Sequence, residues 1–148
     1  MINIKEEFVT LEVAQLLKEA GFDWCCERYY YDDGDEILEY RAEPLNYNST
    51  VYAPNCNDQC WTSPTQAEAC RWVREVKGWN IEIQLVKRNQ ALYSVNLVNI
   101  NDDSLNDGIL ALDETYQSYE DAVEAGLLKY LETIIVEDEE KNYYGNVF

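Results

Sequence analysis

The chain has no histidine and few bases, with 11 Lys and Arg against 29 Asp and Glu in 148 residues. Its formal net charge is −18. A protein that binds bare DNA or RNA must neutralise phosphates with Lys and Arg, and an anionic membrane attracts basic segments. We therefore expect no direct contact with nucleic acid or with a membrane. The charge favours a basic surface on another protein, including a surface that normally holds nucleic acid.

The absence of histidine also removes the Ser–His and Cys–His pairs of nucleophilic catalysis. Gly34, Gly108 and Gly126 are isolated, so the chain has no glycine-rich phosphate loop. Carboxylates are plentiful, which leaves a paired-acid hydrolase open, but any acidic chain offers such pairs by chance. We expect no enzymatic activity and no cofactor.

Long apolar runs and an export signal are missing too. No run approaches the ~20 residues of a membrane-spanning helix, and the first residues lack a basic-then-apolar pattern. We therefore expect a cytosolic protein whose five cysteines are free thiols. Cys56 and Cys60 could bind zinc with Cys25 or Cys26, but a second close pair is lacking. Residues 102–113 only partly match a calcium loop, so we predict no metal site.

The acidic residues concentrate at the two ends of the chain. Residues 1–43 carry a net charge of −8 and residues 101–148 a net charge of −11, whereas residues 44–100 carry +1. An excess of acidic residues by itself can be explained by solubility. The two-block pattern predicts an acidic working face if the fold brings the blocks together.

Three segments begin with a hydroxyl residue four positions before an alanine. These are Thr10, Ser63 and Ser118. Such a side chain can accept a hydrogen bond from a free N–H of the first helical turn. The Ser63 signal is the strongest, because Pro64 and Gln66 complete a capping box with proline at the first helical position. Gly21 and Gly78 end the first two helices, and all three helices have an apolar face at helical period.

Strand signals separate these helices. Residues 80–87 and 91–98 alternate between apolar and polar and form a hairpin, and residues 25–31 and 36–41 form another about a turn at 32–35. The predicted fold class is α+β, with three amphipathic helices packed on an antiparallel sheet of hairpins in the order α-β-β-α-β-β-α. The predicted core contains Val13, Leu17, Trp72, Val76, Ile83, Val95, Leu127 and Leu131.

We expect one acidic domain over residues 1–136 and an acidic tail over residues 137–148. Residues 43–62 are predicted to be an irregular loop.

Tyrosines next to acids mark the first hairpin. Tyr29 and Tyr31 share one face of a strand and Tyr30 takes the other, so at least one face should belong to the core. The tyrosines can be cross-strand pairs that stabilise the hairpin, or contact area for a partner. The predicted partner-binding residues are Tyr29, Tyr31, Asp32, Asp33, Asp35, Glu36 and Glu39.

Residues 8–24 resemble the opening of small uncharacterised proteins from phages and prophages of gut Bacteroidales. Those proteins also carry a "SAPTQA…WLRE" helix, which is similar to residues 63–75, and a final "TYEEA…A" helix, which is similar to residues 115–125. The resemblance covers roughly half of the chain. It implies a mobile-element origin and a bacterial host cytosol, and it supplies no activity and no site.

Two hypotheses follow. In the first, the protein is a phage-type accessory module that binds a basic, nucleic-acid-binding host protein and inhibits it by imitating nucleic acid. In the second, it is a structural or accessory homodimer that pairs through the aromatic hairpin, with no inhibitory role.

Overall fold

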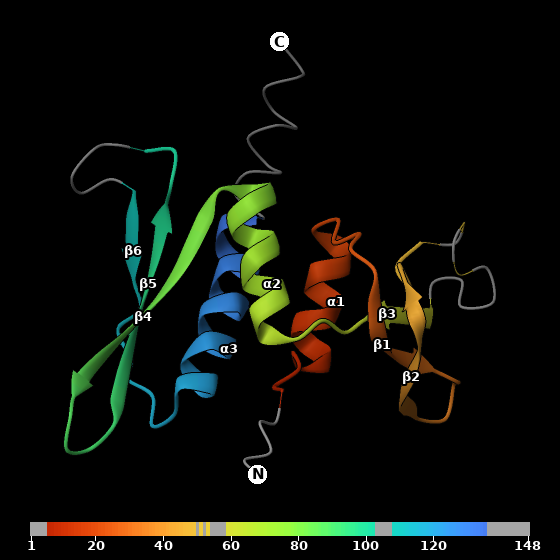
Figure 1. Ribbon diagram of the computed structural model, residues 1–148, viewed down its shortest axis with the longest axis horizontal. Coiled ribbons are helices and arrows are strands. Elements are labelled where there is room, and N and C mark those ends of the chain that lie inside the picture. Colours follow the sequence, from red (N-terminus) through yellow and green to blue (C-terminus); the bar gives the residue numbers. More distant parts are fainter. Residues whose placement is uncertain (1–5, 50, 52, 54–58, 103–107, 136–148) are drawn as a thin grey trace. The chain divides into compact units, whose positions relative to one another are not determined.

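The computed structural model describes residues 6–49, 51, 53, 59–102 and 108–135 (Figure 1). In this part the fold is α+β, with three α-helices and two three-stranded antiparallel sheets. Contacts group the chain into two units, residues 1–69 and 70–148. The predicted element order is roughly matched, but two short strands are additional and the strands form two sheets. The expected tail at 137–148 lies outside the described residues.

Helix α1 (Leu11–Glu19) begins at the predicted cap in the first unit. The Thr10 hydroxyl accepts a hydrogen bond from the Val13 amide at 3.3 Å. The helix buries Val13 and Leu17, and it ends before Gly21, whose φ of +93° is a left-handed conformation that favours glycine. The cap, the buried face and the end of this helix are confirmed.

The sheet of the first unit places its first strand in the middle, in the order β2-β1-β3. Its strands are β1 (Cys26–Asp32), β2 (Ile37–Leu45) and β3 (Cys60–Thr62). The predicted hairpin is confirmed by the β1–β2 pairing. Residues 43–62 are not wholly irregular, because they contain the end of β2 and all of β3. The Lys18 ammonium donates to the Cys60 carbonyl at 2.8 Å and ties α1 to β3.

Helix α2 (Gln66–Trp72) begins later than predicted. Thr65, not Ser63, is the capping residue: its hydroxyl accepts from the Glu68 amide at 3.1 Å, and the Glu68 carboxylate accepts from the Thr65 amide at 3.1 Å. Val9 N donates to the Pro64 carbonyl at 3.1 Å in a bridge beside Thr65. This pairing with the N-terminal segment is a tertiary contact, and it keeps the residues before Thr65 extended.

The second unit contains a hairpin, a short third strand and a long helix. Its elements are β4 (Trp79–Lys87), β5 (Leu92–Asn99), β6 (Ile109–Ala111) and α3 (Tyr119–Lys129), which continues as a π-helical turn over Tyr130–Ile135. Ile83 lies opposite Val95 in the confirmed β4–β5 hairpin. The Ser118 hydroxyl accepts from the Asp121 amide at 3.0 Å, which confirms this cap. Helix α3 packs on β4 and β5 (Figure 1).

Most of the predicted core is buried. The buried members are Val13, Leu17, Trp72, Val95, Leu127 and Leu131, and Ile83 is half-buried. The prediction that Val76 belongs to the core is wrong, because this residue is 53% exposed. Residues Val73–Lys77 form a π-helical turn, in which the residue five positions on, not four, returns to the same side. Accordingly it is the Lys77 ammonium that lies over the Trp72 ring, 5.4 Å from its centroid.

The expectation of five free thiols is wrong for Cys60, which is disulfide-bonded. Cys25, Cys26 and Cys70 are free, and Cys56 lies outside the described residues. The expectation rested on the redox environment inferred from a missing export signal, and such an argument does not use the positions of the sulfur atoms.

Thiol counting tests this assignment. In unfolded protein without a reductant, we expect Cys25, Cys26 and Cys70 to react with a thiol reagent and Cys60 to react only after reduction. In folded protein the exposed Cys25 should react first, because burial raises the pKa of Cys26 to about 12 and that of Cys70 to about 11. Mass spectrometry of the labelled peptides would show this, and labelling of Cys60 in unreduced, unfolded protein would contradict it.

Candidate functional site

The turn of the β1–β2 hairpin presents acidic side chains in a fixed arrangement. The Asp33 carboxylate accepts hydrogen bonds from the amides of Asp35 at 2.9 Å and Glu36 at 2.8 Å. Gly34 has a φ of +96° and its amide donates to the Asp32 carboxylate at 2.9 Å. The hydrogen bond from Glu36, followed by that from Asp35, holds the pKa of Asp33 below its usual value. The turn therefore keeps Asp33 ionised.

Tyrosine rings cover one face of this hairpin. Tyr29 stacks on Tyr40 from the facing strand, with ring centroids 5.4 Å apart, and on Tyr47, with centroids 4.1 Å apart. Tyr31 meets the edge of Tyr40 at 6.3 Å. Tyr29 and Tyr31 are half-buried against a small core that includes Tyr47 and Cys60. They thus serve the hairpin itself, as the cross-strand alternative predicts, whereas Tyr40 keeps 41% of its surface exposed.

The opposite face holds Tyr30 and, unexpectedly, Glu39. Tyr30 is buried and its hydroxyl donates to the Val9 carbonyl at 2.9 Å. Glu39 lies directly opposite Tyr30 in the register, so it lies on the face away from Tyr29 and Tyr31. It forms an ion pair with Arg28. Glu39 is therefore separated from Tyr29 and Tyr31, with which it was predicted to bind a partner.

The seven predicted residues thus share one hairpin but not one surface. Asp33, Asp35 and Glu36 are exposed at the turn, and Asp32 is half-buried. The sequence prediction omitted Tyr40, although it lies four residues after Glu36 on the same predicted strand. It also omitted Tyr47, which reaches the stack from a segment that was expected to be irregular.

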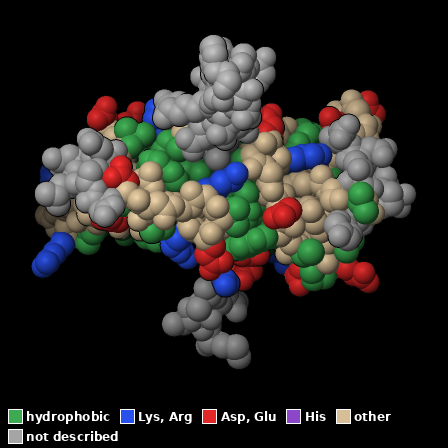
Figure 2. All heavy atoms as spheres, turned by 90° about the horizontal axis from the view of Figure 1, so that it is seen from above, with side chains coloured by type: hydrophobic (Ala, Val, Ile, Leu, Met, Phe, Trp, Pro, Cys, Tyr) green, Lys and Arg blue, Asp and Glu red, His purple; other side chains and the backbone are tan. Residues whose placement is uncertain are grey.

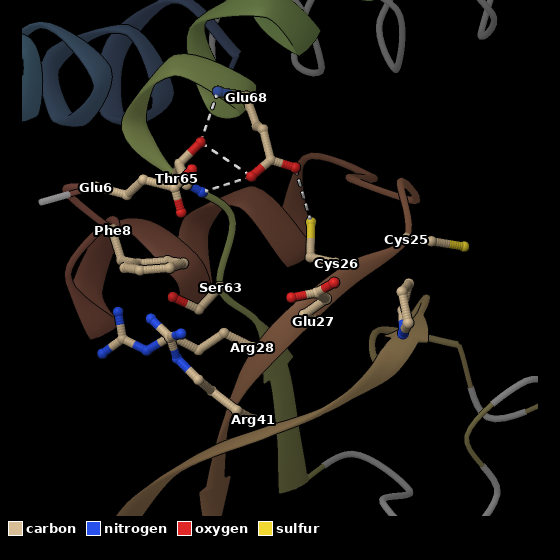
Figure 3. A pocket seen from close by; sticks show the side chains of 11 residues that line it. Glu6, Phe8, Cys25, Cys26, Glu27, Arg28, Arg41, Ser63, Thr65 and Glu68 are labelled. Carbon is tan, nitrogen blue, oxygen red and sulfur yellow. Dashed lines mark hydrogen bonds between the residues drawn. The ribbon is translucent and has the colours of Figure 1, made fainter. Parts of the chain in front are cut away.

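A pocket of about 330 Å³ opens beside the face that holds Glu39, within the first unit (Figure 3). The guanidinium carbons of Arg28 and Arg41 lie 4.4 Å and 5.1 Å from the centroid of the Phe8 ring. In Figure 3 both guanidinium groups lie beside Phe8, away from Cys26 and Glu68. This site was not predicted from the sequence: a turn at residues 32–35 would pair Arg28 with Glu39, whereas the observed register pairs Arg28 with Arg41.

The Cys26 thiol, which lines this pocket, is poorly suited to nucleophilic chemistry. Burial first, and then the Glu68 carboxylate, raises the pKa of Cys26 to about 12. The thiol donates to Glu68 with a sulfur–oxygen distance of 3.7 Å. A thiol with this pKa is protonated at neutral pH. Over the described residues, no group of three or more Cys, Asp or Glu side chains is arranged to hold a metal ion.

In Figure 2, Asp and Glu side chains lie in small groups among hydrophobic and other side chains. Within the described ranges, no helix has the length and apolar character needed to cross a bilayer. No family model, curated protein or solved structure matches this chain.

Proposed function

We propose that this protein is a small acidic accessory module of phage type that binds a basic surface of a host protein through the turn of its β1–β2 hairpin. The observation that carries the proposal is the exposed, pre-ordered carboxylate group of Asp33, Asp35 and Glu36. Within the described part of the chain, no Lys or Arg forms an ion pair with any of the three. Their charge is therefore available to a partner.

The physical basis is charge complementarity. Carboxylates at the turn can accept charge-assisted hydrogen bonds from the Arg and Lys that a partner uses to hold phosphates. Attraction between opposite charges speeds association more than it strengthens the final complex. The stacked tyrosines below the turn hold the hairpin rigid, and exposed Tyr40 offers contact area with a polar tip. An inhibitor that imitates nucleic acid would use these features.

A charge-changing variant tests the site. The triple variant Asp33→Asn, Asp35→Lys, Glu36→Lys keeps an oxygen at residue 33 to accept the two turn amides. Against a partner purified after capture from host lysate, its association rate constant at low salt should fall at least ~10-fold, while its melting temperature changes little. The matched control is Asp113→Asn, Glu114→Lys, Glu132→Lys, which changes the net charge equally at exposed sites in the second unit and should associate much faster than the first variant.

Two outcomes would contradict the proposal. A folded hairpin variant that associates as fast as the control would remove the turn as the binding site. Binding that ignores salt between ~50 and ~500 mM would remove the imitation of nucleic acid, because exposed charges are screened within ~8–10 Å at physiological salt.

A further inference from the structure

The pocket beside β2 is lined by two positively charged side chains, although the chain as a whole is strongly acidic. Arg28 and Arg41 are directly opposite each other in the β1–β2 register, an arrangement in which like charges repel. Arg28 pairs with Glu39, and its side chain is only 13% exposed. Arg41 is exposed, and no carboxylate among the described residues lies within ion-pair distance of it. Both guanidinium groups lie over the same Phe8 ring, and only that of Arg28 is paired with a carboxylate among the described residues.

A buried hydroxyl in the same pocket has no hydrogen-bond partner. Ser63 is 0% exposed, and its Oγ bonds to no described group. Its amide donates to the Arg28 carbonyl at 2.9 Å, which fixes it beside the arginine strand, and the residue lines the pocket with Arg28 and Arg41 (Figure 3). Buried hydroxyl groups are almost always hydrogen-bonded in native proteins. This one is therefore available to a ligand.

We propose that this pocket binds the carboxylate of a small organic acid, with Arg41 and Arg28 facing the charge and the Ser63 hydroxyl donating a hydrogen bond. Arginine recognises a carboxylate through paired N–H donors, and a pocket of about 330 Å³ suits a small molecule. A single negative charge fits better than a phosphate dianion, because Glu6, Glu27 and Glu68 also line the pocket. This site is separate from the acidic turn. Its arginines are positively charged, whereas the turn is negatively charged.

The test is a titration of the full chain with sodium acetate, with sodium chloride as the reference at equal ionic strength. The Nε–Hε signals of Arg28 and Arg41 should shift and saturate in nuclear magnetic resonance spectra. Arg41→Gln should weaken acetate binding about tenfold, since it removes a charged hydrogen-bond donor. The matched control Arg71→Gln removes an exposed arginine in the second unit that pairs with Glu75, and it should leave acetate binding unchanged.

Ser63→Ala separates binding from folding. Because the hydroxyl has no partner to lose in the free protein, this variant should keep or raise the melting temperature while acetate binding weakens several-fold. A lowered melting temperature with unchanged affinity would overturn the role of Ser63. The proposal fails if no signal saturates by ~100 mM acetate, or if Arg41→Gln and Arg71→Gln bind equally. Tighter binding of inorganic phosphate than of acetate would overturn the assignment to a carboxylate.

Discussion

Replacing Leu127 with alanine is expected to lower the free energy of unfolding by about 2–5 kcal/mol. Leu127 lies on α3 and its side chain is fully buried. The substitution removes apolar atoms from the core and leaves a cavity that close-packed neighbours fill only in part. Urea denaturation followed by tryptophan fluorescence measures the change, provided that the slope of the transition is the same in both proteins.

The chain offers a matched control for this experiment. Val76→Ala also shortens an aliphatic side chain in a helical segment, but Val76 is 53% exposed, so its effect should stay within about 0.5 kcal/mol. A change of that small size for Leu127→Ala would show that Leu127 is not in the core. A cost above ~2 kcal/mol for Val76→Ala would show that the helix continues as a regular α-helix past Trp72.

The parts of the fold that follow from neighbouring residues were predictable. The caps at Thr10 and Ser118 need only a hydroxyl and an amide three residues away, and the two hairpins follow from alternation about a turn. Ser63 does not cap the helix, because the bridge between Phe8 and Thr65 keeps the residues before Thr65 extended. This bridge joins segments that lie far apart in the sequence. Tertiary contacts of this kind override local propensity.

Short elements and irregular turns escaped prediction for a different reason. Strands β3 and β6 contain three residues each, too few to show a period, and they exist because a longer strand pairs with them. The π-helical turn after Trp72 changes which residues share a face, and no residue type in it signals that change. Val76 was therefore placed in the core by a regular period that the backbone does not keep.

The candidate site also combines features that neighbouring residues predict with features that depend on distant segments. Alternation along β1 correctly separates Tyr30 from Tyr29 and Tyr31. The same two-residue period, carried across the turn to β2, would have assigned Glu39 to the face of Tyr30. The arginine pocket could not be assembled in this way, because Phe8 and Ser63 reach it from outside the hairpin.

The second large effect on stability is expected from a substitution at Gly126 on α3. A Cβ atom there would lie 2.6 Å from Cγ2 of Ile81 and 3.0 Å from Cγ1 of Val95, both closer than packed carbon atoms allow. Alanine favours a helix over glycine by about 1 kcal/mol, but forcing a methyl group into a filled interface costs about 1–3 kcal/mol. Because β4 and β5 must move away from α3 to admit it, we expect Gly126→Ala to destabilise the protein.

A double-mutant cycle with Ile81→Ala identifies the cause of that loss. Ile81→Ala removes the Cγ2 atom that the new methyl group would meet, so Gly126→Ala should cost less in this background than alone, with a coupling of about 0.5–3 kcal/mol. The four proteins need the same denaturation experiment. Equal costs in both backgrounds would show that Ile81 does not set the distance between α3 and the sheet. A gain of stability in the single variant would show that helix propensity outweighs packing at this position.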